Sequence, residues 1–491
     1  MKPAPFDNSY VRLPQSFYEC LDPQPVRAPR LVAFNRGLAR HLGLAWACGE
    51  DSDLAAIFSG NRLPAGAEPL AMAYAGHQFG HFVPQLGDGR ALLLGEVVDR
   101  AGVRRDIALK GSGQTPFSRG GDGRAALGPV LREFLLSEAM HALGVPTTRA
   151  LAAVVTGQKV ARERALPGAV VTRVARSHVR VGTFQYFAAR RDTQAVRVLA
   201  DYVIARHDPE LAGTADRYSQ LLRAVIERQA RLVAKWLSVG FIHGVMNTDN
   251  AAISGETIDY GPCAFMDEFN PGQVFSSIDR HGRYAYDNQP GIAQWNLARL
   301  AETLLPLLDN DDDRALEQAN QAVGGFAQCF AQHWRALFGA KLGLAHADAA
   351  DSDLIHDLLA LMHHQHADFT LTFRHLADAI EPGPGDGALV QQLDDPTALE
   401  DWLVRWRTRL AAEQQAPEAI AERMRAVNPA IIARNHLVER AIRAAEDDDD
   451  FAIFDALRDA LARPFEPPAD GTGLQLPPQP HERVTQTFCG T

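Results

Sequence analysis

The residues best suited to chemistry lie in one polar stretch near the middle of the chain. The segment His243–Asn250 ends in the pair Asp249-Asn250, and the motif Asp259-Tyr260-Gly261 follows after a short apolar run. An Asp and an Asn on one loop, with a second Asp after a short strand, can present a base and two oxygen ligands to a metal-bound nucleoside triphosphate. We therefore expect the chain to bind ATP.

This stretch differs at one position from the usual catalytic loop of protein kinases. That loop reads His-Arg-Asp or His-Gly-Asp and continues to an Asn, and Val245 stands here in the place of its Asp. Asp249 is the only carboxylate left in the loop. If the loop contains a general base, Asp249 is the candidate.

Composition limits the fold class and the partners. Hydrophobic residues make up 46% of the chain and charged residues 22%, which is typical of globular rather than disordered proteins. The formal net charge is −11, from 60 acidic and 49 basic residues, so we expect no nucleic-acid partner. No apolar run of about 18 residues occurs, and the first residues lack the apolar core of a signal peptide. We expect no membrane association and a cytoplasmic location.

Glycine density and strand-like runs indicate a small sheet in the first half of the chain. Arg30–Leu42 is amphipathic and is expected to be a helix, and glycine becomes frequent between Tyr74 and Gly128. Ala125–Leu143 has helical spacing and ends at the stop signal Gly144-Val145-Pro146. The runs that resemble strands are Ala91–Val98, Arg105–Lys110, Ala150–Thr156 and Ala169–Arg176. Their order is that of a kinase amino-terminal lobe.

The second half favours helices. The segments with amphipathic helical spacing are Asp216–Val239, Asn296–Leu308, Ala315–Phe338, Ser352–His363, Ala398–Glu413 and Asn428–Ala445. The acidic run Glu446–Asp450 is expected to be a solvated loop. We predict an α+β protein with two kinase-like lobes and extensions at both ends. Its parts are an N-terminal extension (1–70), a nucleotide-binding N-lobe (71–192), a helical C-lobe with the catalytic and metal loops (193–463) and a flexible tail (464–491).

Lys110 is a candidate for the lysine that a kinase fold sends from a strand to the nucleotide phosphates. It closes the apolar run that begins at Asp106. Its partner would be a Glu on the following helix, where Glu133 lies early enough to reach back and Glu138 is the second choice. Two surface charges on adjacent elements are the alternative.

Glycine turns and arginines offer further contacts for phosphate. Gly87-Asp88-Gly89-Arg90 precedes a strand and Gly120–Arg124 precedes a helix, and glycine lets backbone N–H groups approach phosphate oxygens. Neither segment completes a Rossmann or P-loop motif, so plain turns are the alternative. Arg173 and Arg180 suit bidentate phosphate contact, with surface salt bridges as their alternative.

The cysteines and histidines indicate neither a zinc site nor a disulfide framework. The five cysteines lie far apart without a Cys-x-x-Cys motif, and His77, His81 and the cluster at 363–366 lack a His-Glu-x-x-His frame. Cys263 follows the Asp-Tyr-Gly motif, and Cys489 lies on a Pro-rich tail that could reach it. A disulfide between them could gate the site, with two unrelated thiols as the alternative.

Several longer segments carry a resemblance to a known family: Phe6–Tyr10, Tyr74–Gly80, Leu109–Arg119, His243–Asn250 and Asp259–Pro262. Through them the chain resembles the selenoprotein O family, also called YdiU, of protein adenylyltransferases with a kinase-like fold. In animal members a selenocysteine stands near the carboxyl end, at a position that resembles Cys489 here.

The resemblance implies that ATP binds flipped relative to ordinary kinases, so that its α-phosphate faces the acceptor. AMP would pass to Ser, Thr or Tyr hydroxyls of proteins, the enzyme itself included, and pyrophosphate would leave; UTP is an open alternative as donor. Asp249 would be the general base, Asn250 and Asp259 the ligands of Mg²⁺ or Mn²⁺, and Lys110 the phosphate lysine oriented by Glu133. The nucleotide cradle would consist of Gly87, Gly89, Arg90, Asp122, Gly123, Arg173 and Arg180.

Two other functions stay open on the sequence. A phosphotransferase would use Asp249 and Asn250 for transfer of the γ-phosphate. A catalytically inactive nucleotide-binding scaffold would explain Val245, although a scaffold has no need of a full set of metal ligands. The residues therefore argue against the scaffold, and the resemblance implies an adenylyltransferase rather than a phosphotransferase.

Overall fold

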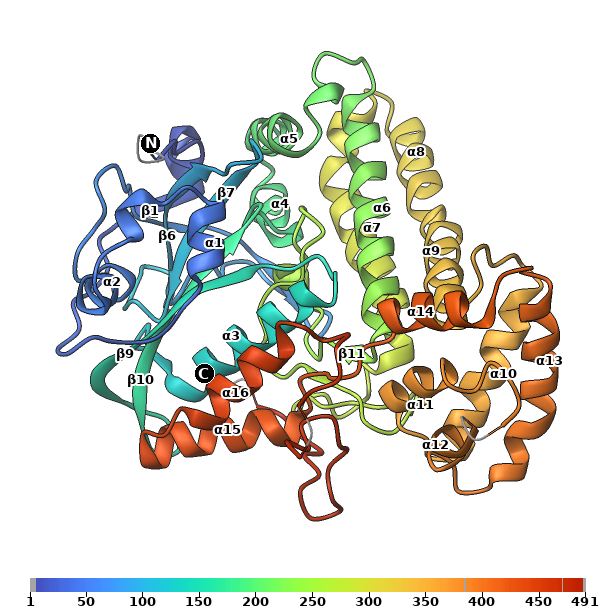
Figure 1. Cartoon of the computed structure of the whole chain (residues 1–491). Helices are drawn as coiled ribbons and strands as arrows, with labels where there is room; N and C mark the ends of the chain where they lie inside the picture. Colours follow the sequence, from blue (N-terminus) through green and yellow to red (C-terminus); the bar gives the residue numbers. More distant parts are fainter. Residues whose placement is uncertain (1–5, 384–385, 470, 489–491) are drawn as a thin grey trace.

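The computed structural model describes residues 6–383, 386–469 and 471–488. A part built around a β-sheet lies beside a part built from long helices, and the last helices of the chain return to the sheet part (Figure 1). This mixed content agrees with the expected α+β class.

The sheet has eight strands in the order β1-β3-β6-β7-β10-β9-β2, with β8 paired to β10. All of these pairings are antiparallel. The four expected strands are confirmed as β6, β7, β9 and β10, with small changes in their ends. The strands are β1 (Tyr18–Cys20), β2 (Arg30–Phe34), β3 (Leu70–Met72), β6 (Ala91–Val98), β7 (Arg104–Lys110), β8 (Ala125–Ala126), β9 (Arg149–Ala161) and β10 (Ala165–Ala175).

The pairing of β7 with β10 places two predicted cations on the same face of the sheet. Lys110 lies opposite Val171, and Ala108 lies opposite Arg173. Opposed residues of antiparallel strands point to the same face, as do alternate residues along a strand. Lys110 and Arg173 therefore leave the sheet on the same side.

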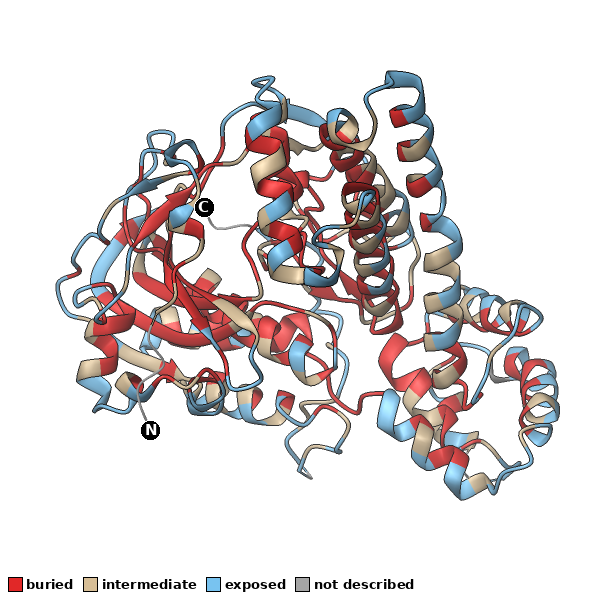
Figure 2. Cartoon of the chain, turned by 90° about the horizontal axis from the view of Figure 1, so that it is seen from above, coloured by how far each residue is buried: buried red, intermediate tan, exposed pale blue. Residues whose placement is uncertain are grey.

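Both faces of the sheet are buried, as Figure 2 shows for most of its strand residues. Along β10, Ala169 and Val171 pack on the side of α3 (Leu127–Ala142), whereas Val170 packs on the side of α2 (Asp51–Phe58). Because side chains alternate along a strand, a strand covered on both faces is apolar at nearly every position. This rigid layer carries Lys110 and Arg173.

The prediction of one helix over Arg30–Leu42 is wrong in its first half. Residues 30–34 form β2 and pair with β9, and α1 covers only Arg36–His41. Asn35 separates the two elements, since its side chain accepts a hydrogen bond from the backbone N–H of Leu38 and caps the helix. Pairing at the edge of the sheet outweighs the helical spacing.

The helical character of the second half is confirmed. Helices α6 to α9 run side by side next to the sheet part (Figure 1). The helices are α4 (Val181–Ala188), α5 (Thr193–His207), α6 (Arg217–Ser238), α7 (Gln289–Leu308), α8 (Asp312–Gly324), α9 (Phe326–Lys341), α10 (Asp351–His364), α11 (Phe369–Leu376), α12 (Asp386–Val390), α13 (Glu400–Ala411), α14 (Pro417–Val427), α15 (Asn435–Asp448) and α16 (Ala452–Leu461).

Three expected helices have clearly different bounds. The helix expected over Asn296–Leu308 begins earlier, at Gln289, as α7. The single helix expected over Ala315–Phe338 is two helices, because Gly324-Gly325 ends α8 and glycine is a poor helix former. The helix expected from Asn428 begins only at Asn435. Pro429 disfavours helical backbone in the residue before it, which explains the irregular segment between α14 and α15.

The acidic run at residues 446–450 is exposed from 447 onward, as its charge predicts, but it is only in part a loop. Its first three residues belong to the last turn of α15. Glu446 accepts the backbone N–H of Gly128 at 2.9 Å and pairs with Arg164 at 3.0 Å. Gly128 lies in the first turn of α3, where N–H groups have no partner within the helix, so the carboxylate stabilises that end.

The carboxyl-terminal segment contacts the helical part at several points. Thr487 donates its backbone N–H to the carbonyl oxygen of Phe275 at 2.8 Å and its hydroxyl to that of Pro262 at 2.6 Å. The division of the chain into domains stays a prediction. Among the described residues, no helix combines the length and the hydropathy that crossing a bilayer requires.

Candidate active site

A cavity of about 410 Å³ opens between the sheet and the helical part. Residues from β7, α3, β10 and the polar loop after α6 line it, so segments far apart in the sequence meet there. It brings together all the residues that the sequence predicts for nucleotide, metal and base: Gly87, Gly89, Arg90, Lys110, Asp122, Gly123, Glu133, Arg173, Arg180, Asp249, Asn250 and Asp259. Val245 lines it as well.

Lys110, the last residue of β7, contacts two carboxylates. Its Nζ lies 2.7 Å from Oε2 of Glu133 on α3 and 3.1 Å from Oδ1 of Asp259. Glu138, the second choice as partner, binds Arg149 at 2.7 Å and does not line the cavity. The structure therefore pairs Lys110 with the first choice.

Arg173 on β10 binds the same two carboxylates. Its guanidinium donates to Oε1 of Glu133 at 2.7 Å and to Oδ1 of Asp259 at 2.6 Å. Burial alone would raise the pKa of Glu133, but Arg173 and Lys110 hold that pKa below its usual value. Arg173 is 3% exposed, so it is no surface salt bridge.

Asp259 is where the cations converge. Burial would raise its pKa, but Arg173, Lys110 and Arg180 together hold the pKa well below the usual range, so the carboxylate is ionised. Its backbone has a φ of 66°, in the left-handed region that is uncommon for residues other than glycine. Such strained backbone clusters at functional sites.

Arg180, the residue before α4, connects Asp259 to the polar loop. Its Nη1 donates to Oδ2 of Asp259 at 2.8 Å and to the carbonyl oxygen of Asp249 at 2.6 Å. The guanidinium lies over the ring of Tyr74, 4.6 Å from its centroid. Its buried Nε has no partner among the described residues, which leaves one donor for a ligand.

Two short paired strands, β11 (Phe241–Ile242) and β12 (Ala264–Phe265), hold the two ends of the polar segment together. His243 is buried and is held by protein groups: its backbone N–H donates to Oε1 of Gln289 at 3.0 Å, and its ring Nε2 lies 2.9 Å from the carbonyl oxygen of Ile258. Burial lowers the pKa of His243, so the ring is neutral. The residue is therefore a support for the loop.

Asp249 is 7% exposed and lies in the wall of the cavity. Gln78 donates to its Oδ2 at 3.2 Å, and its Oδ1 has no partner among the described residues. Burial raises the pKa of Asp249 to about 6. A carboxylate with a pKa near the working pH and a free oxygen is suited to accept a proton.

A hairpin that the sequence analysis did not assign to the site covers this loop. Its strands are β4 (Gly76–Gln78) and β5 (His81–Val83), and the backbone N–H of His77 donates to Oγ1 of Thr248 at 2.6 Å. A Cβ on the glycine that opens β4 would lie 2.5 Å from Oδ1 of Asp249. Only glycine fits there without displacing the carboxylate.

The two glycine turns also depend on close approach. A Cβ on Gly87 would lie 2.4 Å from the ring of Phe117, and one on Gly123 would lie 2.1 Å from the backbone of Gly113. Asp122 in the second turn pairs at 2.8 Å with Arg162, which lowers its pKa. Gly87 and Gly123 are therefore packed parts of the cavity wall, whereas residues 120–122 of the second turn are exposed.

The donor atoms of the cavity suit a hard divalent cation. Asp259 offers carboxylate oxygens, and Asn250 donates its amide N–H to the carbonyl of Val245 at 3.0 Å, which keeps its amide oxygen available. The buried Oδ1 of Asp249 lacks a partner among the described residues. Mg²⁺ and Mn²⁺ prefer oxygen ligands. Asn250 and Asp259 therefore fit such an ion.

Sequence reasoning missed four residues that shape the site: Tyr74, Gln78, Asp88 and Arg162. Tyr74 and Gln78 belong to a segment that carried the family resemblance but no assigned role. Asp88 is buried, accepts the backbone N–H of Met72 at 3.0 Å and lies 3.9 Å from Arg180. No spacing rule connects these positions to Asp249 or Asp122, because their contacts depend on the tertiary fold.

The predicted redox pair is only half described. Cys263 is buried directly after the Asp-Tyr-Gly motif, and Cys489 lies outside the described residues. Thr487, near the end of the described chain, binds the carbonyl of Pro262. The disulfide stays a prediction.

The comparisons with known proteins agree on one family. The model of the protein adenylyltransferase SelO family matches residues 2–462. The protein nucleotidyltransferase YdiU of Rhizobium rhizogenes is 61% identical over 489 residues, which cover 100% of this chain and 97% of that protein. The YdiU protein of a Bradyrhizobium strain (BTAi1) is 62% identical over 488 residues, and that of Rhizobium meliloti is 61% identical over 486 residues; in both cases 99% of each chain is covered.

Proposed function

The chain belongs to the protein adenylyltransferase SelO family, and from this premise we propose that it transfers AMP from ATP to Ser, Thr or Tyr hydroxyls of proteins and releases pyrophosphate. The observation that best supports the proposal is the position of Asp249. It presents a buried, unpartnered carboxylate oxygen in the same cavity wall as a cluster of three cations.

The cations supply the charge that a nucleotide needs. Lys110, Arg173 and Arg180 surround Asp259 at 2.6 to 3.1 Å. Phosphoryl and nucleotidyl transfer depend mainly on positioning and on neutralising phosphate oxygens. In this proposal the three side chains hold the phosphates and stabilise the charge that develops on the departing pyrophosphate.

Asp249 acts on the acceptor. Its Oδ1 takes the proton of the hydroxyl, the hydroxyl oxygen forms a bond to the α-phosphorus, and the bond from that phosphorus to the bridging oxygen of pyrophosphate breaks. Mg²⁺ or Mn²⁺, held by Asn250 and Asp259, would supply further positive charge at the phosphates. Val245 cannot act as a base, so the loop depends on one carboxylate.

We also propose that the two parts of the molecule correspond to kinase-like lobes. In support, a strand carries Lys110, the next long helix carries Glu133, and an Asp-Asn loop and an Asp-x-Gly motif face them across the cavity. The N-lobe would span residues 71–192 and the helical C-lobe residues 193–463.

The position of the label in ATP tests the proposed reaction. With Mg²⁺ or Mn²⁺, ATP labelled at the α-phosphate should label acceptor proteins and the enzyme itself, and ATP labelled at the γ-phosphate should release labelled pyrophosphate and leave protein unlabelled. A parallel reaction with α-labelled UTP identifies the preferred donor. Label arriving only from the γ-phosphate would make the protein a kinase, and binding of ATP without transfer from either position would make it a scaffold.

A further inference from the structure

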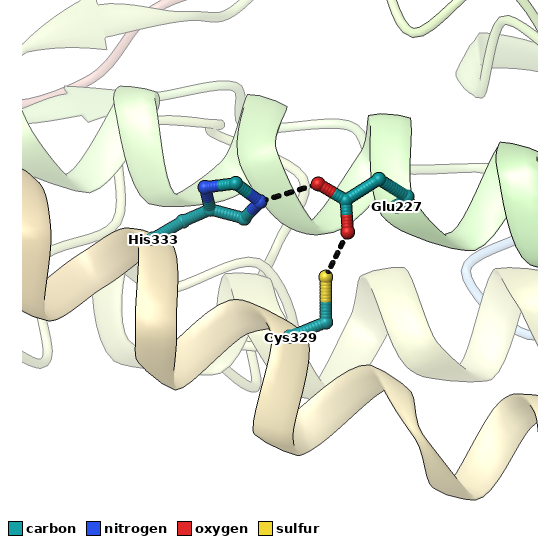
Figure 3. A group of neighbouring side chains, drawn as sticks. All are labelled: Glu227, Cys329 and His333. Atoms are coloured by element: carbon teal, nitrogen blue, oxygen red, sulfur yellow. Dashed lines mark hydrogen bonds and ion pairs between the residues drawn. The ribbon is translucent and has the colours of Figure 1, made fainter.

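Away from the nucleotide cavity, three side chains of two neighbouring helices converge on one point (Figure 3). Glu227 comes from α6, and Cys329 and His333 come from α9. The thiol of Cys329 lies 2.5 Å from Oε2 of Glu227, and Nε2 of His333 lies 2.6 Å from Oε1 of the same carboxylate. One ligand atom of each residue lies within 4.8 Å of the other two.

The geometry of the helices produces this arrangement. Cys329 and His333 are four residues apart, so they lie on the same face of α9, one turn after the other. Helices α6 and α9 pack along each other, which sets Glu227 opposite both. The cluster thus rests on two rigid elements, which hold side chains more firmly than loops do.

We propose that Glu227, Cys329 and His333 bind a divalent transition-metal ion, for which Zn²⁺ is the best fit. Thiolate, imidazole and carboxylate are its three usual kinds of protein ligand, and two ligands on one helix face with a third from a facing helix is a compact way to supply them. Water would complete the coordination, because the three residues are only partly buried.

The distances leave room for an ion after small movements of the side chains. Zinc binds ligands at about 2.0 to 2.3 Å, so the ligands of a tetrahedral site lie about 3.3 to 3.8 Å from one another. Glu227 now bridges the other two residues at hydrogen-bond distance, and rotation of its exposed carboxylate opens the centre of the triangle. A surface groove lined by Glu227, Cys329, Gln321 and Gly325 gives an ion access from solvent.

An ion at this position would clamp α6 to α9. The residues that follow Glu227 on α6 support the loop after Asn250: Arg228 donates to the carbonyl of Ile253 at 3.2 Å, and Gln229 to that of Ala252 at 2.7 Å. The clamp would therefore stabilise the helix on which the catalytic loop rests. None of the three proposed ligands lines the nucleotide cavity, so the inference does not depend on the proposed reaction.

Titration with Co²⁺ tests the proposal, because cobalt bound to a thiolate gives a charge-transfer band that oxygen ligands do not give. The full chain, reduced and freed of metal with a chelator, is titrated in excess Mg²⁺, which occupies oxygen-ligand sites. One equivalent of Co²⁺ should produce the band, and one equivalent of Zn²⁺ should remove it. Zn²⁺ in excess should also raise the melting temperature of the chain by a few degrees.

Variants locate the ion. Cys329→Ser should abolish the band, and His333→Ala and Glu227→Gln should each weaken Co²⁺ binding at least about tenfold. Cys20→Ser removes an exposed thiol elsewhere and should leave the band unchanged. All four variants should keep their circular dichroism and their transferase activity in Mg²⁺. A thiolate band that persists in Cys329→Ser, or the absence of any band in the unaltered chain, would overturn the proposal and leave the three residues as a hydrogen-bonded cluster.

Discussion

Two regions of the cavity satisfy their carboxylates in opposite ways. In the first region, Lys110, Arg173 and Arg180 surround the carboxylates of Glu133 and Asp259, and every contact is between 2.6 and 3.1 Å. In the second region, Asp249 receives one neutral hydrogen bond from Gln78 and keeps one oxygen without a partner among the described residues.

The pKa values follow this difference. The cations hold the pKa of Asp259 well below its usual range although the residue is buried, whereas burial raises that of Asp249 to about 6. This difference shows that burial alone does not decide the role of a carboxylate. The pKa of Asp259 favours its ionised form, which suits the metal ligand that we propose, and the pKa of Asp249 suits the proposed proton acceptor.

The largest effect should follow from removing the negative charge at which the three cations meet. Asp259→Asn keeps the shape of the side chain but removes the charge that meets Lys110, Arg173 and Arg180. We expect AMP transfer to fall by on the order of 10³-fold or more, since in the proposed mechanism both metal binding and the order of the cations depend on that charge. Initial rates of α-label transfer measure the loss.

A matched control removes an exposed carboxylate near the cavity. Glu163 lies at the turn between β9 and β10, and Glu163→Gln should keep full activity. Thermal denaturation of both variants checks the fold. Near-normal transfer by a folded Asp259→Asn protein would remove Asp259 from the site.

A smaller loss should follow from displacing Asp249 without changing it. Gly76→Ala places a methyl group 2.5 Å from the current position of Oδ1. Because the carboxylate must move by about an ångström, kcat should fall by about 10²-fold while the affinity for ATP changes little. Gly291→Ala is the control, since a Cβ there meets no atom within 4 Å. Equal activity of the two variants would show that the position of Asp249 is unimportant.

The smallest expected effect is on the pH dependence of the transfer rate. The pKa of Asp249 is raised to about 6. At a pH below this value the carboxyl group is protonated and cannot accept a proton, so the rate should fall as the pH drops through it. Gln78→Leu removes a hydrogen bond that lowers the pKa, so the acid limb of the rate profile should move to higher pH by less than about one unit. The rate at high pH should change little. An acid limb that stays in place, or moves to lower pH, would contradict the role given to Gln78.

The sequence predicts the pair of Lys110 and Glu133 better than the residues around it. The order of an apolar strand and a following helix predicts Glu133 as the first choice and Glu138 as the second choice of partner for Lys110, and the structure pairs Lys110 with Glu133. Arg162 and Gln78 escape such reasoning, because their partners lie 40 and 171 residues away in the sequence. Only the assembled fold brings them together.

The errors in secondary structure have the same origin. The helical spacing of Arg30–Leu42 is real, but pairing of its first residues with β9 decides their conformation. Glu446 is the first residue of the acidic run, yet it accepts a hydrogen bond from the backbone N–H of Gly128 on α3, which is distant in the sequence. Likewise the i, i+4 pair Cys329 and His333 carries no metal signal until α6 brings Glu227 to it.

The central claim is that Asp249 is the proton acceptor in a loop where Val245 has replaced the usual Asp. Its most direct test is single-turnover transfer of α-label by Asp249→Asn, compared with binding of ATP to the same protein. The account predicts ATP affinity within about threefold of the unaltered chain, because Lys110, Arg173 and Arg180 are untouched, and transfer reduced by about 10²- to 10⁴-fold. Transfer at an undiminished rate by the Asn variant would contradict it.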